Sequence, residues 1–481
     1  MLGYIILGIV IAIVVIFLLV LFVRTVRFKP EKEAPVEAED IQVNREKIVD
    51  DMVSMIQCKT ISARNPAHMD MAEFEKFQKL LEERYPLVHK HFELKKLGLN
   101  GLLYYMKGKS SNQPSVCMSH YDVVPVDEGG WEKPAFGGIV ENGEIWGRGT
   151  LDTKCSLLAI MEAAEQLLAE GYVPEQDLYF SFSGEEEVDG RSCDAIVSYF
   201  KERGITPAFV LDEGGAVVDN VFPGVKEACA MIGIAEKGSV NVNFTMKGNG
   251  GHASAPPSHT LLGELSQAVT AIEAHPFKCQ FTKPVLELFD TMGRHSTFFY
   301  RMIFANLWIF APVLDRICKK AGGELNAMLR TTAAVTKMEG SKAYNVLPST
   351  ASFGVNMRLL GEDTTESAIA YLKQIIKNDR VEVQAVNRGK PSIVSDTNCV
   401  GWDKLKLAIR KTWPEALVSP YLMVGGTDAS YYCKITDKIY RFSPMQLTDE
   451  EMARIHGHNE RVSVDNLVKM VQFYVRMLKL L

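Results

Sequence analysis

Residues 115–125, SVCMSHYDVVP, join a run of small and apolar side chains to a histidine and an aspartate. A short apolar run of this kind predicts a buried strand. The strand ends where His120 and Asp122 begin, so both polar side chains are expected at its carboxyl end. Ligands of open α/β sheets bind at that edge. This stretch is therefore the first candidate for a functional site.

Two further buried strands are predicted downstream, and each also ends in acidic residues. Residues 178–182 (LYFSF) precede three glutamates at 185–187, and residues 208–211 (AFVL) precede an Asp-Glu pair at 212–213. Between the first two strands, the apolar residues of about 154–170 recur near a period of 3.6, which predicts a helix. Strands that alternate with helices predict an α/β domain with a mostly parallel central sheet flanked by helices.

The pattern changes to a period of two at 240–247 (VNVNFTMK) and again at 351–358 (ASFGVNMR), which predicts half-exposed strands of another sheet. A helix near 365–377 and a strand near 381–386 are expected to follow the second of these. We therefore predict an inserted α+β domain over about 236–390.

The amino terminus begins with 22 residues, 2–23, that carry no charge. As a helix rising about 1.5 Å per residue they would extend roughly 33 Å, enough to cross a bilayer core. A cleaved signal peptide is the alternative, but the segment has no basic region before it and no clear small-x-small cleavage site. The sequence favours a retained transmembrane anchor.

The side of the membrane is not decided by the sequence. Arg24, Arg27, Lys29 and Lys32 follow the span, so the positive-inside rule favours a cytoplasmic catalytic body. The nine cysteines are scattered without a CxxC pair, which indicates reduced thiols and favours the same side. The predicted order is an anchor at 1–29, a charged stalk at 30–44, the first part of a catalytic domain at 45–235, the inserted domain at 236–390, and the second part of the catalytic domain at 391–481.

Composition limits the class of protein. A chain of 481 residues is long enough for two or three domains. Its net charge of −6 and its 47% hydrophobic residues exclude a strongly basic nucleic-acid binder and a wholly disordered chain. One stretch, 298–317, is rich in aromatic and aliphatic residues but interrupted by polar ones. It is either a core helix or an apolar surface that faces lipid or an acyl chain.

Carboxylates from three strand ends are expected to share one crevice. Taken singly, each motif also fits an ordinary turn or a solvated surface. Together, the like charges would repel one another and raise their pKa values unless cations lay among them. Two zinc ions need side chains of this kind, namely imidazoles, several carboxylates and a free carboxylate as base. Asp152 and a histidine of residues 455–460, His456 or His458, supply further candidate ligands.

At this point the sequence resembles the M20 family of metallopeptidases and aminoacylases, and most of all its branch with carboxypeptidase S and the N-fatty-acyl-amino-acid hydrolase/synthase. The resemblance covers about 45–481. It is carried by these motifs: HYDVVP at 120–125, GRGTLDTK at 147–154, EEEVDG at 185–190, LDEG at 211–214, GGHASAPP at 250–257, NVLPS at 345–349, GGTDA at 425–429 and IHGHNE at 455–460.

The resemblance implies two zinc ions, for which Co²⁺ or Mn²⁺ could substitute. His120, Asp152 and Asp212 would hold one ion, and Asp152, Glu187 and His456 the other, so that Asp152 bridges them. Two positions depend on how the motifs are aligned. The family pattern Glu-Glu-x-x-Gly selects 186–187 among the three glutamates, and the motif at 455–460 favours the first of its two histidines.

Other roles are carried over in the same way. Asp122 would orient the imidazole of His120, and Glu186 would be the general base that activates water. The inserted domain resembles the family's lid and dimerisation domain, so a homodimer is one implied partner. In it, His252 would stabilise the oxyanion, usually in the partner subunit's site. Asn345 and Arg358 would contact the substrate, with Arg358 binding its carboxylate.

The implied activity is hydrolysis of an amide bond beside an amino-acid carboxylate, in N-acyl amino acids or at the carboxyl end of peptides. The anchor and the stretch 298–317 favour long acyl chains. A short-peptide carboxypeptidase or dipeptidase of broad specificity is the alternative within the enzymes. A membrane-tethered binding protein without catalysis is the alternative from another class.

Overall fold

The structure, a computed structural model, describes residues 1–481 except 32–33, 35 and 38. An eight-stranded sheet forms the centre of the main domain, in the order β1-β2-β6-β3-β7-β16-β8-β15. Its strands are β1 (Glu93–Leu97), β2 (Gly101–Met106), β3 (Ser110–His120), β6 (Gln176–Ser183), β7 (Phe209–Val218), β8 (Cys229–Glu236), β15 (Leu417–Met423) and β16 (Ile439–Leu447).

The three strands predicted from the sequence lie side by side at the centre of this sheet. β3 is parallel to both β6 and β7, and β7 is parallel to β16. The sheet is mixed rather than mostly parallel, because β2 runs antiparallel to both β1 and β6, and β8 runs antiparallel to both β7 and β16. The expectation of an α/β sheet flanked by helices is confirmed at this coarser level.

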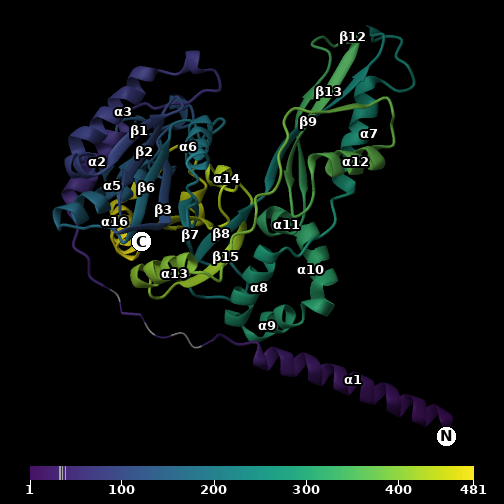
Figure 1. Cartoon of the computed structure of the whole chain (residues 1–481). Helices are drawn as coiled ribbons and strands as arrows, with labels where there is room; N and C mark the ends of the chain where they lie inside the picture. The colour runs from purple at the N-terminus through teal and green to yellow at the C-terminus, as the bar shows by residue number, and fades with distance from the viewer. Residues whose placement is uncertain (32–33, 35, 38) are drawn as a thin grey trace.

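Helices cover both faces of the sheet (Figure 1). Val116 and Met118 of β3 pack in a cluster with α6, whereas Cys117 between them packs in the larger cluster with α5. Both faces are therefore buried, which explains the continuous apolar run of β3. The helices of this domain are α2 (Arg45–Ile56), α3 (Met71–Arg84), α4 (Pro86–His91), α5 (Lys154–Ala169), α6 (Arg191–Glu202), α13 (Val400–Thr412), α14 (Ala429–Tyr432), α15 (Asp449–Met452) and α16 (Val464–Leu480). A small sheet of β4 (Ile139–Glu141), β5 (Glu144–Trp146) and β17 (Arg461–Ser463) lies beside them.

A second, smaller domain, here called the satellite domain, stands away from the main one (Figure 1). Its antiparallel sheet has the order β11-β13-β9-β14, and Phe244 stacks on Phe353 in a separate core with ring centroids 4.5 Å apart. The predicted strands and helix of this region are found, as part of the following set: β9 (Gly238–Lys247), β10 (Gly251–His252), α7 (Leu261–Ala274), β11 (Thr332–Glu339), β12 (Val346–Leu347), β13 (Thr350–Leu359), α12 (Thr365–Ile376) and β14 (Glu382–Ala385).

Residues 283–329 form a helical insert between β9 and β13 that does not belong to the satellite core. Leu288, Phe289 and Met292 are buried in the core of the main domain, where α8 packs on β15. The region 236–390 thus divides between two cores. The helices of the insert are α8 (Lys283–His295), α9 (Phe298–Ala305), α10 (Leu307–Ala321) and α11 (Gly323–Leu329).

The amino-terminal helix α1 (Leu2–Arg27) projects from the molecule, with the N-terminus at its far end (Figure 1). Among the described residues, it is the helix long and apolar enough to cross a membrane by itself. Its carboxyl-terminal part packs against α9 and α10, which meet at a 108° bend. Phe298, Phe299 and Trp308 are more than half exposed there, whereas Phe304 is buried in the main core. The stretch 298–317 is therefore a pair of partly buried helices that also exposes aromatic side chains. The predicted stalk, 30–44, includes the four residues that lie outside the described ones.

Candidate active site

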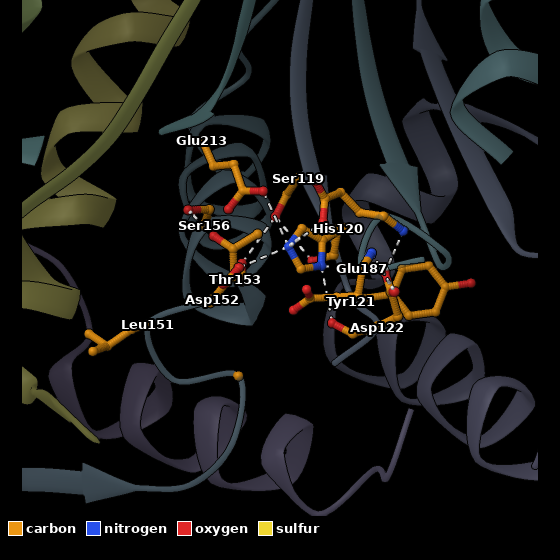
Figure 2. Close-up of polar contacts among 12 residues, drawn as sticks. Ser119, His120, Tyr121, Asp122, Leu151, Asp152, Thr153, Ser156, Glu187 and Glu213 are labelled. Carbon is orange, nitrogen blue, oxygen red and sulfur yellow. Dashed lines mark hydrogen bonds and ion pairs between the residues drawn. The ribbon is translucent and has the colours of Figure 1, made fainter. Parts of the chain in front are cut away.

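The candidate active site lies where β3, β6 and β7 bring polar residues to one edge of the sheet (Figure 2). His120 is the last residue of β3, Glu186 and Glu187 follow the end of β6, and Glu213 lies within β7. Asp152 lies in the loop just before α5. His120 and Glu213 are therefore placed by strands of the sheet, whereas Asp152, Glu186 and Glu187 project from the segments that follow or precede its elements.

Asp152 lies between two imidazoles and faces one with each of its carboxylate oxygens. Its Oδ1 is 3.0 Å from Nε2 of His120, and its Oδ2 is 3.0 Å from Nε2 of His456. Glu213 Oε1 lies 3.3 Å from the same nitrogen of His120. Glu187 Oε2 lies 3.0 Å from the same nitrogen of His456. The result is two groups of donor atoms that share Asp152.

Each group contains the donor atoms that a transition metal or zinc prefers. In both groups, one nitrogen and two carboxylate oxygens all lie within 4.8 Å of one another. Imidazole nitrogen and carboxylate oxygen are the ligands of catalytic zinc sites, which leave a coordination position open for water or substrate. The described residues therefore fit a pair of divalent ions bridged by one carboxylate.

The excess of negative charge in the cluster also favours the binding of divalent cations. Burial would raise the pKa of Asp152, but hydrogen bonds with His120 and His456 outweigh burial and lower that pKa. Hydrogen bonds with Asp152 and Glu187 raise the pKa of His456 to about 10. Burial raises the pKa of Glu213 to about 8 and also raises that of Glu187. The site holds more carboxylates than its imidazoles neutralise, and bound cations remove that imbalance.

Glu186 lies outside both donor groups, with Oε2 4.0 Å from Nε2 of His120. Burial raises its pKa well above the ordinary value, and the neighbouring carboxylates of Glu213 and Asp428 add to the rise. Glu186 also lines a cavity of about 230 Å³ whose wall includes the other acidic residues of the cluster and His456. A carboxylate in this position can reach a water molecule or substrate in the cavity.

Asp122 is fully buried and contacts both His120 and the turn that carries Glu186 and Glu187. Its carboxylate lies 3.4 Å from Nδ1 of His120, whose other nitrogen faces the cluster. The same carboxylate accepts the backbone N–H groups of Glu186 and Glu187 at 3.1 and 3.2 Å. Asp122 thus contacts the His120 ring through its backbone carbonyl, 3.0 Å from Nδ1, as well as through its carboxylate. The carboxylate also fixes the turn that carries two acidic residues.

The structure does not bring Asp212 into a donor group, and Glu213 occupies the place expected for it. Asp212 Oδ2 accepts the backbone N–H of Ala429 at 2.9 Å, whereas Glu213 faces His120. Successive side chains of a strand point to opposite sides, so only one of two neighbouring carboxylates can face the histidine. In the expected group of His120, Asp152 and Asp212, the structure therefore has Glu213 in place of Asp212.

Two further residues that the sequence did not single out support the site. Glu460 is fully buried and accepts backbone N–H groups of the loop before Asp152. Asp428 is buried beside Ser183, and burial raises its pKa to about 8. Both lie in motifs that the sequence analysis quoted, but their role depends on contacts with segments remote in the chain.

The three residues expected in the inserted domain lie outside this cluster. His252 is exposed in β10, which pairs with β12 at the tip of the satellite domain, and its Nδ1 contacts Oγ of Ser254 at 2.7 Å (Figure 1). Asn345 precedes β12, and its carbonyl oxygen accepts the N–H of Ala253. Arg358 lies near the other end of β13, paired with Ser239 of β9. Within one chain the structure does not bring them to the metal ligands.

Three kinds of comparison bear on the family of this chain, namely with a family model, with relatives of known sequence and with solved structures. The family model described as "Peptidase family M20/M25/M40" matches residues 116–480. A probable carboxypeptidase S-like 2 of Dictyostelium discoideum is 35% identical over 88% of this chain and 82% of its own length. The N-fatty-acyl-amino acid synthase/hydrolase PM20D1 of Xenopus tropicalis is 33% identical over 90% and 86%. The fold matches the M20 metallo-carboxypeptidase Sso-CP2 from Sulfolobus solfataricus with a TM-score of 0.67, at 18% identity over 90% of this chain and 98% of that one. The chain belongs to the M20 family of metallopeptidases and is a hydrolase of that family.

Proposed function

We propose that the chain is a di-zinc amidohydrolase that cleaves the amide bond of N-acyl amino acids and releases a carboxylic acid and a free amino acid. The observation that carries the proposal is Asp152, whose two oxygens face His120 and His456 and link two donor groups. Peptides that end in a free carboxylate contain the same arrangement of amide and carboxylate. Short-peptide carboxypeptidase activity is therefore the second candidate, favoured by the relative named carboxypeptidase S-like.

The donor groups suggest how the ions would be held. His120, Asp152 and Glu213 would hold one zinc ion, and Asp152, Glu187 and His456 the other; the same nitrogen and oxygen donors would accept Co²⁺ or Mn²⁺. When bound, such ions polarise the scissile carbonyl and lower the pKa of the attacking water.

Glu186 is the proposed general base. It lies beside His120 without belonging to either donor group. Its carboxylate takes a proton from the attacking water as the new carbon–oxygen bond forms. It then delivers that proton to the amide nitrogen as the carbon–nitrogen bond breaks. Asp122 keeps Glu186 in place through the backbone N–H that it accepts.

The test is Glu186→Gln, with Asp189→Asn as a matched control in the same loop. Asp189 is paired with Arg191 at 2.7 Å and lies outside the donor groups. Glu186→Gln is expected to lower kcat for N-acyl-phenylalanine by about a hundredfold or more while zinc content stays at two ions per chain. Full activity in Glu186→Gln would overturn the mechanism. No turnover of acyl amino acids or dipeptides by the wild-type protein, with no bound metal, would favour the non-catalytic binding protein.

A second copy of the chain is the proposed source of His252. This histidine lies at the tip of the satellite domain, away from its own cluster, so it could act on a substrate only in another subunit. Its imidazole would then stabilise the negative charge on the carbonyl oxygen, and Asn345 beside it would contact the substrate. Mixing inactive Glu186→Gln with inactive His252→Ala tests this proposal. Recovery of activity in the mixed dimer is expected, and no recovery would contradict it.

We also propose that α1 is a retained membrane anchor. Thr25 and Asn306 are fully buried against each other, and Arg24 donates to the carbonyl of Ala305 at 3.0 Å. Cleavage after α1 would remove Arg24 and Thr25 and with them their hydrogen bonds to Ala305 and Asn306. Amino-terminal sequencing of the protein from membranes should find residues of α1 intact, and a terminus beyond Phe28 would contradict the anchor.

A further inference from the structure

A second cavity, of about 350 Å³, adjoins the cluster and has no role in the mechanism above. It shares Gly214, Leu447 and Ile455 with the cavity that contains the acidic residues. Gly214 directly follows Glu213, and Ile455 directly precedes His456. The shared residues therefore connect the second cavity to the place where the scissile carbonyl would lie.

Most of the side chains that line this cavity are apolar. β7 and β8 contribute Ala216, Val218 and Met231, and the helical insert contributes Leu325 and Met328. A group the size of a water molecule, such as a methylene, occupies about 30 Å³. The cavity therefore has room for a chain of about ten carbons. That is more than the side chain of one amino acid occupies, and it suits a flexible hydrocarbon chain.

The charges at the cavity select which end of the substrate it can hold. Asp219, Glu324 and Asp449 line it, and the described lining residues include no lysine, arginine or histidine. Carboxylates in this lining repel the carboxylate of an amino acid, whereas an uncharged chain is not affected. The amino-acid end of the substrate would therefore lie elsewhere, and the acyl end is the one that fits.

From this lining, its charge and its position beside Glu213, we infer that the cavity binds the acyl chain of the substrate. The inference rests on the proposed amidohydrolase function and deepens it, because it assigns the place in this chain where the acyl end of the substrate binds. The helical insert that closes the cavity with Leu325 also carries α9 and α10, which contact α1. One unit thus joins the acyl site to the proposed anchor.

The test compares Leu325→Trp with Leu286→Trp in the full chain in lipid nanodiscs. Leu325 is half-buried on α11 and lines the cavity, so the larger side chain fills it. Leu286 belongs to the same insert, but it is 45% exposed and does not line the cavity. The substrates are the acetyl, hexanoyl and decanoyl amides of phenylalanine, and N-acetyl derivatives of glycine, leucine and phenylalanine.

For wild type and Leu286→Trp, kcat/KM should rise with chain length by up to about fourfold per methylene. Leu325→Trp should lose about tenfold or more on the decanoyl substrate while acetyl-phenylalanine stays within about twofold. The same chain-length dependence in all three proteins would overturn the inference. It would also be overturned if Leu325→Trp altered the preference among amino acids instead, because the cavity would then hold the side chain.

Binding of decanoate, the acid released by hydrolysis, gives a readout that does not need turnover. Calorimetry should give binding to wild type that is weakened about tenfold or more in Leu325→Trp and unchanged in Leu286→Trp. If no substrate is hydrolysed but decanoate binding follows this pattern, the proposed reaction fails and the acyl site stands. Equal binding to the two variants would reject the acyl site even if the enzyme is active.

Discussion

The buried carboxylate of Glu460 is paired with the guanidinium of Arg148, with Oε2 2.6 Å from Nη1. Its other oxygen, Oε1, accepts the backbone N–H groups of Gly149, Leu151 and Asp152 at 3.1, 2.7 and 3.3 Å. Asp152 is the carboxylate that faces both histidines. Glu460 thus fixes the backbone from which that carboxylate projects, although its own side chain belongs to neither donor group.

Glu460→Gln should therefore weaken metal binding without removing a ligand. The amide of glutamine keeps only one acceptor oxygen. Its NH₂ group cannot accept a hydrogen bond from Arg148 or from the N–H groups of the loop. In addition, Arg148 is left buried without its charged partner. Loss of a partner of this kind typically costs about 10–100-fold in metal affinity and about 3–5 kcal/mol of stability. Zinc competition with a chelator measures the first and urea unfolding measures the second.

Glu450→Gln is the matched control, because Glu450 pairs with Arg454 at the surface. Because the Glu450 side chain is 80% exposed, its pair with Arg454 should contribute at most about 1 kcal/mol. If Glu460→Gln and Glu450→Gln bound zinc equally well, Glu460 would have no positioning role.

The number of bound zinc ions can show which of the neighbouring residues Glu213 and Asp212 binds metal. Glu213→Gln should lower the zinc content from two ions to about one, because the amide replaces an anionic ligand beside His120. Asp212→Asn should retain two ions, because its side-chain oxygen can still accept the N–H of Ala429. Elemental analysis of both proteins distinguishes them, and the opposite pattern would restore Asp212 as the ligand.

This pair of residues also shows where prediction from the sequence ends. Apolar runs followed by polar residues were sufficient to predict the central strands and to place His120 and the acidic residues at 185–187 and 212–213 at one edge. The choice of Asp152, Glu187 and His456 as ligands came from the resemblance to the M20 family. The choice between Asp212 and Glu213 depends on which side of β7 faces His120, and both residues are equally able to bind metal. No local pattern contains that information.

Long-range contacts limited prediction in the same way elsewhere. The bonds from Glu460 to the loop of Asp152 join segments more than 300 residues apart in sequence. The helical insert was predicted as part of the satellite region because it lies between that region's strands. Only packing reveals that Leu288 and Phe289 belong to the core of the main domain.

Gly190, which ends the turn after Glu187, should not tolerate a side chain. Its φ is +60°, and a Cβ would lie 2.3 Å from Oδ1 of Asp428 and 2.6 Å from Tyr431. Gly190→Ala should therefore destabilise the protein by about 3 kcal/mol or more and lower kcat, because both backbone strain and the clash shift the turn. Thermal unfolding and turnover measure these effects.

Gly204→Ala separates backbone strain from the clash. Gly204 has a similar φ of +66°, but no atom lies within 4 Å of its Cβ position. It should cost only about 1–2 kcal/mol and leave kcat unchanged. Equal losses in the two variants would mean that contact with Asp428 is unimportant.

The lowered pKa of Lys237, at the junction of β8 and β9, predicts that the free energy of unfolding depends on pH. Burial, together with the nearby charges of Arg358 and Arg330, lowers the pKa of its ammonium group to about 7. Between pH 7 and about 10 the unfolded chain binds more protons at this residue than the folded chain, so the free energy of unfolding rises with pH. From pH 7 to 9 this residue should contribute a rise on the order of 2 kcal/mol.

Lys237→Met should lack that rise, whereas Lys337→Met, an exposed change on the satellite sheet, should keep it. Urea unfolding of the three proteins at pH 7 and 9 gives the comparison. If wild type and Lys237→Met changed in parallel with pH, titration of Lys237 would not contribute to stability.

Asn306 should hold α1 against the helical insert. Its Nδ2 donates to the carbonyl oxygen of Met302 at 2.9 Å and to Oγ1 of Thr25 at 3.3 Å, and its Oδ1 accepts from Nε of Arg24 at 3.1 Å. Asn306→Leu would leave the Thr25 hydroxyl without this donor in a buried place, a cost of about 1–3 kcal/mol. Hydrogen exchange at the junction of α9 and α10 should then accelerate about tenfold or more. The exposed change Asn112→Leu should leave that exchange rate unchanged. Equal exchange in Asn306→Leu and wild type would mean that α1 is held by its apolar contacts with Phe298 and Trp308 alone.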